Sequence, residues 1–278
     1  MLIKKNKELL SLKSHSYRSR DFKKLKKNIK NIVLKKFKSI NKKIFLHKDF
    51  SFFHPKISFG NISSLNLLEI DELLIFQYYL KNYRSYSKFI DIGANIGVHS
   101  IINSKLGLKV EAYEPDPKHI SLMKKNIKNN NAIEIKVYQC AVSTVNSKML
   151  FTRVLGNTTG SHLTGAKKNV YNDVKQFKVK VVQAKKIIKK NYLVKIDAEG
   201  EESKILSSLK KNHFMENDFI CEIGSKENAK IIYQKLKKEK INSYAQKINF
   251  KKVKKLKDIP TSYKEGTLFI SSKNIWKI

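Results

Sequence analysis

From about residue 87 onward, the chain alternates between short apolar runs and longer stretches in which apolar residues recur with helical spacing. Short apolar runs predict β-strands, and apolar positions three to four residues apart predict helices. Because strands and helices take turns, we expect a mostly parallel α/β sheet, doubly wound, with helices on both faces. The predicted strands are 88–92, 109–114, 133–139, 192–197 and 218–223, and the predicted helices are 97–106, 117–130, 201–210 and 226–240.

Four further strand-like runs complete this pattern. The runs 148–154 and 176–182 lie on either side of a polar loop at 156–162. The last two, near 242–250 and 266–272, could form an antiparallel edge of the sheet.

The first 50 residues have a different composition, with 17 lysines and arginines and only three acidic residues. Their partly helical apolar spacing predicts one or two basic amphipathic helices. We expect residues 1–60 to form an N-terminal extension and 61–278 the main domain. The extension could pack on the main domain, or it could rest on an anionic membrane or a partner. The apolar positions concerned are Phe22, Leu25, Ile29, Ile32, Val33, Phe37 and Ile40.

The segment that joins the extension to the first core strand has two predicted parts. Residues 50–66 are rich in aromatics and predict a short strand or hairpin that covers a pocket. Residues 69–84 have the spacing of a helix.

The net charge of the 278-residue chain is +35, which suggests an affinity for nucleic acid or anionic membranes. However, nearly all of the basic residues are lysine, and only Arg18, Arg20, Arg84 and Arg153 are arginine. Arginine is the preferred group for phosphates and base edges. We therefore interpret the charge as a compositional bias, which predicts only weak, salt-sensitive binding to polyanions.

The two cysteines, Cys140 and Cys221, lie within apolar runs and are expected to be buried free thiols. This usage is typical of a reducing compartment. The sequence has neither the apolar segment of a signal peptide nor a run long enough to span a membrane, so we expect a cytoplasmic protein.

The segment Asp91-Ile92-Gly93-Ala94-Asn95-Ile96-Gly97 predicts a strand, a glycine turn and the start of a helix. In α/β folds, such units form nucleotide pockets, because glycine allows close approach to the main chain and the helix N-terminus offers free N–H groups. The spacing differs from the dinucleotide fingerprint and from a phosphate-binding Walker loop. A tight turn that binds nothing is the alternative.

Glu114 ends the second predicted strand, 23 positions after Asp91. An acid at this position typically accepts hydrogen bonds from ribose hydroxyls. The alternative is a solvated strand end. The combination of this acid with the glycine turn favours ribose binding.

A second group of candidate residues, Lys195, Asp197 and Glu199, ends the fourth predicted strand. If the strand continues through them, their side chains point to the same side. Burying these charges is costly unless they pair or meet a ligand. The alternative is a helix N-terminus that favours acids, which suits Glu201 and Glu202.

Two other residues, Glu222 and His162, are candidates for a site. Glu222 ends the fifth predicted strand and could close the crevice, although it could also be an ordinary strand-end acid. His162 lies in the polar loop and is a candidate general base, although a lone loop histidine is more often solvated. His99 follows the glycine turn, and we expect it to be packed rather than functional.

These motifs resemble the FkbM family of S-adenosylmethionine-dependent methyltransferases over about residues 87–272. The matching pieces are the glycine turn, Tyr113-Glu114-Pro115, Ala141-Val142-Ser143, the loop 157–162 and Lys195-Ile196-Asp197-Ala198-Glu199-Gly200. The glycine turn is shared by many methyltransferases, and its combination with the last motif is much more specific.

The resemblance implies a class I methyltransferase fold and O-methylation, typically of a sugar or glycan hydroxyl. It implies that Asp91, Gly93, Asn95 and Gly97 hold the methionine part of S-adenosylmethionine, that Glu114 holds the ribose, and that Cys140, Ala141 and Val142 line the adenine. Lys195, Asp197, Glu199 and His162 are then the catalytic candidates, and Glu222 is a substrate residue.

This chain departs from the family pattern at one place. The family often has a histidine soon after the acid of the fifth strand, and this chain has none, which puts any substrate role of that histidine in doubt.

Two alternatives remain open at this point. The charge suggests a nucleic-acid binder or a nucleic-acid methyltransferase, but base methyltransferases commonly carry an Asn/Asp-Pro-Pro-aromatic element where this chain has Asp197-Ala198-Glu199-Gly200. Asp197, Glu199 and Glu222 could together hold Mg²⁺. Because Lys195 already supplies positive charge beside them, we expect no required metal.

Overall fold

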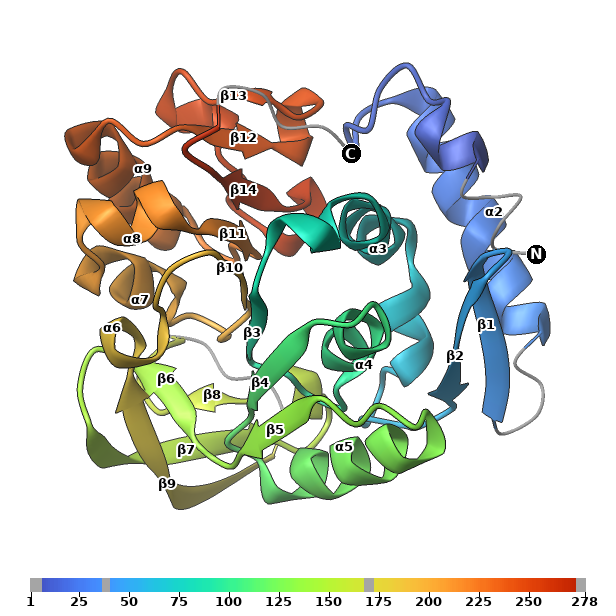
Figure 1. The fold of residues 1–278 in the computed structure, drawn as a ribbon, viewed down its shortest axis with the longest axis horizontal. Helices are drawn as coiled ribbons and strands as arrows, with labels where there is room; N and C mark the ends of the chain where they lie inside the picture. Colours follow the sequence, from blue (N-terminus) through green and yellow to red (C-terminus); the bar gives the residue numbers. More distant parts are fainter. Residues whose placement is uncertain (1–6, 37–40, 168–172, 274–278) are drawn as a thin grey trace.

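The computed structural model describes residues 7–36, 41–167 and 173–273 (Figure 1). Its centre is an eight-stranded sheet in the order β13-β12-β14-β11-β10-β3-β4-β5. The five strands from β11 to β5 are parallel, and the other three form an antiparallel edge; the sequence predicts such an edge from two strands, and β13 is an additional one. The strands are β3 (Lys88–Ile92), β4 (Lys109–Tyr113), β5 (Ile135–Tyr138), β10 (Tyr192–Ile196), β11 (Asp218–Cys221), β12 (Ser243–Ala245), β13 (Lys251–Lys252) and β14 (Leu268–Ile270).

Helices cover both faces of this sheet (Figure 1), so the predicted doubly wound architecture is confirmed. One face carries α3 (Ile70–Asn82), α4 (Val98–Lys105) and α5 (Pro117–Asn129); the other carries α7 (Glu202–Ser208), α8 (Lys211–Glu216) and α9 (Lys226–Glu239). The sequence did not reveal α8 as a separate helix. Within the described ranges, no helix has the length and apolar character needed to cross a membrane.

A second, four-stranded sheet lies beside one end of the main sheet, at the lower left of Figure 1, in the order β6-β9-β7-β8. Its long strands pair antiparallel across the polar loop that the sequence placed between them. The sequence predicted its two long strands but not the two short ones, and it showed no sign that they form a sheet of their own. The strands are β6 (Ala141–Ser143), β7 (Ser147–Val154), β8 (His162–Leu163) and β9 (Val174–Gln183), and the short helix α6 (Ala184–Ile187) follows.

The N-terminal region joins the same core as the sheet. Helix α2 (Arg20–Lys36) buries Phe22, Leu25, Ile29 and Val33 in the hydrophobic cluster that includes α3. The predicted amphipathic helix is thus confirmed over this range. Phe37 and Ile40, which belonged to the same predicted pattern, lie outside the described residues.

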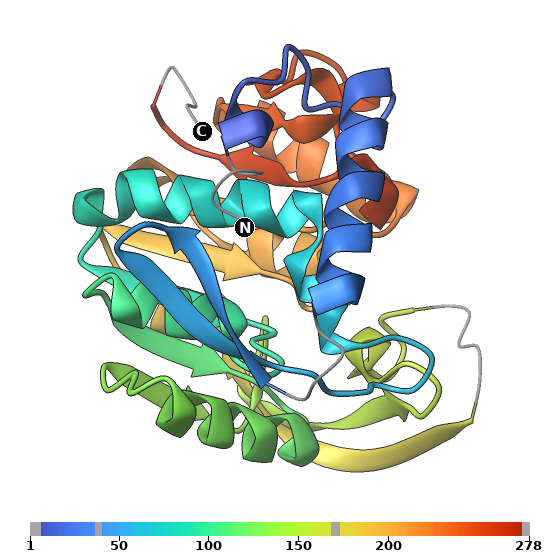
Figure 2. The same cartoon turned by 90° about the vertical axis from the view of Figure 1, so that its right-hand side faces the viewer.

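The expectation of helix up to residue 50 is wrong for residues 41–47, which form strand β1. Strands β1 (Asn41–His47) and β2 (Phe50–Pro55) pair as an antiparallel hairpin beside α4 and α5 (Figure 2). In β1, Ile44 and Leu46 are buried, whereas Lys43 and Phe45 are exposed. This period of two is the pattern of a half-buried strand, and it outweighs the helical spacing further upstream.

Residues 57–63, which we call the N-terminal loop, connect the hairpin to α3 and cross to the second sheet. The backbone N–H of Asn61 donates to the carbonyl of Gly156 at 2.7 Å, and that of Thr158 donates to the carbonyl of Phe59 at 3.0 Å. Gly60 has a φ of +94°, and a Cβ there would overlap the backbone of Gly156. The sequence predicts that residues 50–66 cover a pocket. In the structure, this loop is the part of that segment that lies against the second sheet, and it lines a cavity.

We expect Gly60→Ala to destabilise the protein more than Gly107→Ala. Gly107 has a matching φ of +96° but open space where a Cβ would lie, so both variants carry the left-handed backbone cost of about 1–2 kcal/mol. Only Gly60→Ala must also displace the Gly156 backbone, which adds about 1–3 kcal/mol. Urea unfolding of both variants measures the difference, and equal losses would show that the two loops are not tightly packed.

Candidate active site

The glycine turn after β3 packs directly on the segment that follows β10. Gly93 has a φ of +78°, and a Cβ there would overlap the carbonyl oxygen of Asp197. The backbone N–H of Asp197 donates to the Ile92 carbonyl at 3.0 Å, and that of Gly93 donates to the Tyr113 carbonyl at 3.0 Å. Glycine is therefore required at position 93 by both conformation and space.

A cavity of about 460 Å³ lies along the carboxyl ends of β3, β4, β10 and β11. Its position is that of ligand crevices in open α/β sheets, and its size is typical of small-molecule sites. We call the part beside β4 the donor half and the part beside β10 and β11 the acceptor half. The N-terminal loop, the loop at 157–163 and the start of α3 supply the remaining walls.

Glu114 lies in the donor half with part of its carboxylate already bonded. Its two oxygens accept the backbone N–H groups of Asn95, at 2.8 Å, and of Asp116, at 2.9 Å. A carboxylate offers about four acceptor positions, so capacity remains for two ribose hydroxyls. Asn95, Gly93 and Glu114 all line the cavity, and their contacts to a cofactor stay a prediction.

Asp91 and Gly97 are placed beneath the turn, outside the cavity lining. Asp91 is fully buried and accepts the hydroxyl of Ser100 at 2.6 Å, and the space beside Gly97 is filled by the side chain of Met123. Both residues therefore support the shape of the turn, and direct contact with a bound molecule stays a prediction for them.

The 140–142 stretch divides in a similar way. Ala141 and Val142 line the donor half, together with Tyr113, and give it an apolar wall. Cys140 is buried behind this wall, where burial raises the pKa of its thiol to about 11. Cys140 and Cys221 are both buried free thiols, as predicted.

Asp197 and Lys195 form an ion pair at the acceptor half. The ammonium of Lys195 lies 3.0 Å from Oδ2 of Asp197 and is almost completely buried, whereas Asp197 lines the cavity. Burial alone would lower the pKa of Lys195, but the surrounding carboxylates, led by those of Asp197 and Asp91, outweigh it and raise the pKa. Lys195 is therefore a permanent cation that holds the Asp197 carboxylate in place.

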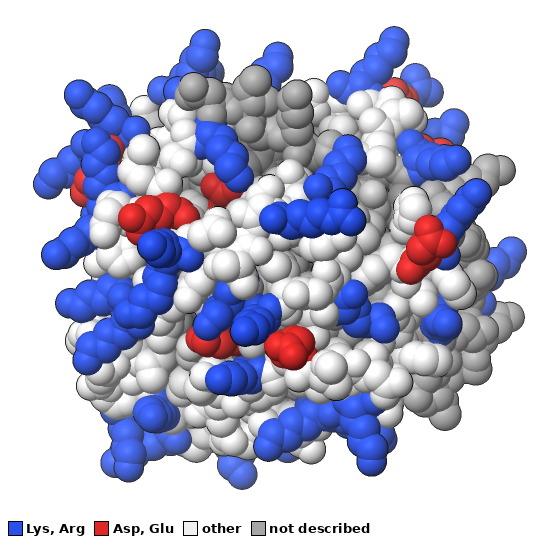
Figure 3. Space-filling view, in the orientation of Figure 1, with Lys and Arg blue, Asp and Glu red and all other residues white. Residues whose placement is uncertain are grey.

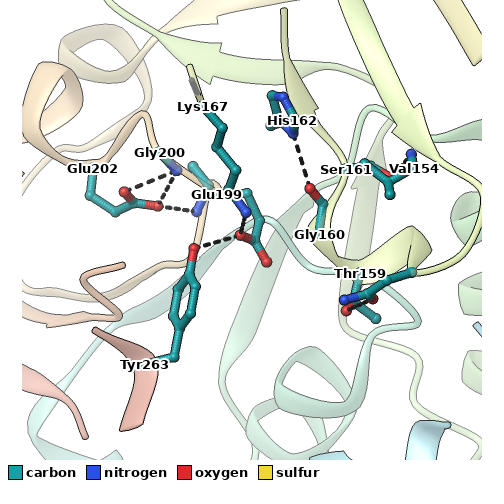
Figure 4. Close-up of polar contacts among 12 residues, drawn as sticks. Val154, Thr159, Gly160, Ser161, His162, Lys167, Glu199, Gly200, Glu202 and Tyr263 are labelled. Atoms are coloured by element: carbon teal, nitrogen blue, oxygen red, sulfur yellow. Dashed lines mark hydrogen bonds and ion pairs between the residues drawn. The ribbon is translucent and has the colours of Figure 1, made fainter. Parts of the chain in front are cut away.

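Glu199 reaches the same crevice by a route that the sequence did not predict. Strand β10 ends at Ile196, and Glu199 has a φ of +51°, so the expected strand alternation does not continue to it. One of its oxygens accepts both the ammonium of Lys167 and the hydroxyl of Tyr263, the latter at 2.8 Å (Figure 4). Burial and the nearby Asp197 raise the pKa of Glu199, while Lys167 and Tyr263 oppose that rise.

Glu202 and Glu201 hold the turn that carries Glu199. The Glu202 carboxylate accepts the backbone N–H groups of Ala198 and Gly200, both at 3.0 Å, at the start of α7 (Figure 4). Burial raises the pKa of Glu202 to about 7 despite these donors. Glu201 accepts the hydroxyl of Ser143 at 2.6 Å. The interpretation of this pair as acids at a helix N-terminus thus agrees with the structure.

Glu222 and Glu72 lie on the far side of the acceptor half. Burial raises the pKa of Glu222 strongly, and the charges of Asp197, Glu72 and Glu199 raise it further. Glu72 comes from α3 and lies 3.1 Å from Nε2 of His99. His99 is buried against Phe76 and Tyr79, so the expectation that it is packed agrees with the structure.

His162 lines the cavity from β8 rather than being solvated, as a lone loop histidine usually is. Its Nδ1 lies 3.0 Å from the carbonyl oxygen of Gly160 (Figure 4), and burial lowers its pKa. The neutral imidazole is therefore favoured at pH 7, which is the state that a general base requires. Its catalytic role stays a prediction.

Several residues of the cavity were not predicted from the sequence. Tyr263 and Lys26 come from opposite ends of the chain, and Lys167 comes from the loop after β8. His119 lies 3.7 Å from Glu114; burial alone would lower its pKa, but the nearby carboxylates of Glu114 and Asp116 outweigh burial and raise it. No local motif marks these residues: the fold brings Tyr263, Lys26 and Lys167 to the cavity over long sequence distances, and His119 comes from α5, just after Glu114.

A metal centre finds no support in the described ranges, where no group of three or more His, Cys, Asp or Glu side chains is arranged to hold an ion. The expectation that no metal is required stays a prediction.

The sheet order, the glycine turn and the acid at the end of β4 together define a class I methyltransferase, whose cofactor is S-adenosylmethionine. Residues 91–243 match the methyltransferase FkbM domain. The chain belongs to the FkbM methyltransferase family, which confirms the resemblance seen in the sequence.

Solved structures with the same type of fold are only distantly similar. The FkbM methyltransferase of Methylobacillus flagellatus KT is 15% identical with a TM-score of 0.41, over 74% of this chain and 52% of that protein. A SAM-dependent methyltransferase of Agrobacterium tumefaciens is 8% identical with a TM-score of 0.43, over 84% and 71% of the two chains. At this distance, neither adds to what the domain match shows. No curated protein matches the chain.

The residues of the donor half fit this cofactor. Glu114 offers free acceptor positions for ribose hydroxyls, the positive φ of Gly93 leaves its backbone accessible, and Ala141, Val142 and Tyr113 give an apolar wall for the adenine.

We expect Glu114→Gln to weaken the binding of S-adenosylhomocysteine by about 1.5–3 kcal/mol, the value of a hydrogen bond to a charged group. The amide keeps the size of the side chain but replaces one acceptor oxygen by a donor. Isothermal titration calorimetry measures the change, with Glu134→Gln, an exposed position, as the control. Unchanged affinity in Glu114→Gln would contradict the ribose assignment.

Proposed function

We propose that the protein transfers a methyl group from S-adenosylmethionine to a hydroxyl oxygen of a sugar or glycan. The observation that carries this proposal is the position of Asp197. Its backbone packs on the Gly93 turn, and its carboxylate lines the cavity at the end of β10. A carboxylate thus lies immediately beside the place where the donor half meets the acceptor half.

The bound cofactor supplies an electrophilic methyl group, so the protein has to align the acceptor and take up one proton. Asp197 suits the role of general base because Lys195 holds one of its oxygens and thereby orients the other. Lys195 itself is unsuited to that role, since the surrounding acids favour its protonated form. Glu199 shares one oxygen between Lys167 and Tyr263, which suits an orienting role.

The composition of the acceptor half supports a polyhydroxylated acceptor. Carboxylates accept hydrogen bonds from several hydroxyls, and Tyr263 adds an aromatic surface with the amphipathic character that suits sugar rings. Glu222, with its raised pKa, can act as a hydrogen-bond donor to an acceptor oxygen in its protonated form.

The charge of the cavity speaks against a nucleic-acid acceptor. In the part of the chain that the structure describes, eight acidic residues line it, but only three lysines and no arginine do. A polyanion would be repelled from such a site. Figure 3 shows lysine and arginine side chains dispersed over the visible face instead of gathered in one stripe, as a nucleic-acid footprint would require. The acids concerned are Glu69, Asp71, Glu72, Glu114, Asp197, Glu199, Glu201 and Glu222.

The proposal is tested by mass spectrometry of glycans from cells with and without the gene. We expect one glycan species to lose the mass of one CH₂ group when the gene is removed, and to regain it when the purified enzyme and S-adenosylmethionine are added to the extract. Failure of wild-type protein to bind S-adenosylhomocysteine, or methyl transfer only to nucleic acid, would contradict it.

We expect Asp197→Asn to lower turnover by about 10²–10⁴-fold, the usual contribution of general-base catalysis, while cofactor affinity stays nearly unchanged. The change keeps the shape of the side chain and removes the charge. Tritium transfer from labelled S-adenosylmethionine to the extract measures turnover, and calorimetry measures affinity. A parallel loss of affinity would assign Asp197 to cofactor orientation, and unchanged turnover would remove it from catalysis.

A further inference from the structure

Tyr263 reaches the cavity from outside the matched domain, which ends at residue 243. It begins the 3₁₀ turn Tyr263–Glu265, and its hydroxyl donates to Glu199 at 2.8 Å (Figure 4). The ammonium of Lys167 lies 5.6 Å from the centre of the phenol ring and bonds to the same Glu199 oxygen. Tyr263 and Lys167 therefore hold one carboxylate of the acceptor half between them.

The space for this phenol is provided by Gly224, just after β11. A Cβ at Gly224 would overlap the ring and hydroxyl of Tyr263, whereas its backbone does not have a left-handed φ. The backbone conformation at position 224 therefore does not require glycine. A larger residue is disfavoured there because its side chain would overlap the aromatic ring of Tyr263. The phenol fills the place that a side chain at position 224 would otherwise take.

The turn that carries Tyr263 is anchored independently of the cavity. The buried Glu265 accepts the ammonium of Lys247 and the backbone N–H of Thr261, both at 2.8 Å. Tyr17, from the N-terminal region, donates to the same carboxylate at 3.3 Å. Tyr263 is 42% exposed, so it stands at the rim of the crevice on a fixed support.

We propose that Tyr263 is the specificity-determining residue of the acceptor half: its phenol closes the β11 side of the crevice, and its hydroxyl positions the Glu199 carboxylate toward an acceptor hydroxyl. This inference rests on the proposed function and extends it. An aromatic ring beside carboxylates offers one apolar surface and several acceptors, which matches a pyranose ring with an apolar C–H face and hydroxyls at its edge.

Two acceptor-independent measurements test this assignment. The first is a stability cycle with Gly224→Ala, Tyr263→Ala and the double variant. Because the three heavy atoms nearest to the added methyl group all belong to the phenol, Gly224→Ala should lower the midpoint of thermal unfolding in the wild-type background and have a much smaller effect when position 263 is alanine. Equal effects in both backgrounds would overturn the proposed packing.

The second measurement is the pKa of Glu199, obtained by titrating ¹³C-carboxyl-labelled glutamate by NMR, with Glu199→Gln as the assignment control. The groups that act on Glu199 are Lys167, Tyr263, Asp197, Glu222 and Glu202. Tyr263→Phe removes a donor to the ionised carboxylate, so the pKa should rise by about one unit. An unchanged pKa would overturn the positioning role.

Methyl transfer to the glycan extract of cells lacking the gene tests the specificity role. Tyr263→Phe should raise the apparent KM for the extract by about tenfold, the equivalent of one hydrogen bond to a charged group, and leave the affinity for S-adenosylhomocysteine unchanged. An unchanged KM, or a loss of S-adenosylhomocysteine affinity, would overturn the proposal. If wild-type protein binds no S-adenosylhomocysteine, the proposed function fails, and the stability cycle and the titration still decide the packing and positioning roles of Tyr263.

Discussion

The contact between the Gly93 turn and the backbone of Asp197 is the constraint on which the rest of the site depends. Strands β3 and β10 are neighbours in the sheet, and their ends are locked together because glycine leaves room for a carbonyl oxygen. This contact fixes the distance between the cofactor turn and the acids after β10. Any residue larger than glycine at position 93 would separate the two halves of the cavity, and small misplacements of reacting groups are costly in catalysis.

The second organising feature is the concentration of acidic residues around the cavity, in a chain whose net charge is strongly positive. Each of these carboxylates is expensive to bury, and most have an identified partner: a lysine, a tyrosine hydroxyl or backbone N–H groups. The lysines that dominate the composition mostly remain outside, in water. The net charge of the chain therefore describes its exterior, whereas the chemistry of the cavity is set by a small number of paired acids.

Much of the fold could be predicted from sequence, because its signals are local. The alternation of strands and helices, the glycine turn and the strand-end acids Glu114, Asp197 and Glu222 all follow from patterns within about twenty residues. What could not be predicted depends on distant contacts. Tyr263 meets Glu199 across 64 positions, and the N-terminal loop meets Gly156 across about 95. The strand β1 was missed because its alternation of buried and exposed residues covers only a few positions and follows a strongly helical segment.

The division of the cavity between the matched domain and its flanking segments has a consequence for how this enzyme could diversify. The donor half is built almost entirely from residues 91–163, whereas the acceptor half also takes Lys26, the start of α3 and Tyr263 from the two ends of the chain. Drift in these flanking segments would remodel acceptor recognition and leave the methyl-donor machinery intact. Relatives that share the central motifs can therefore differ in the molecules they modify, and chimaeras that exchange only the flanks are the natural units for redirecting the enzyme.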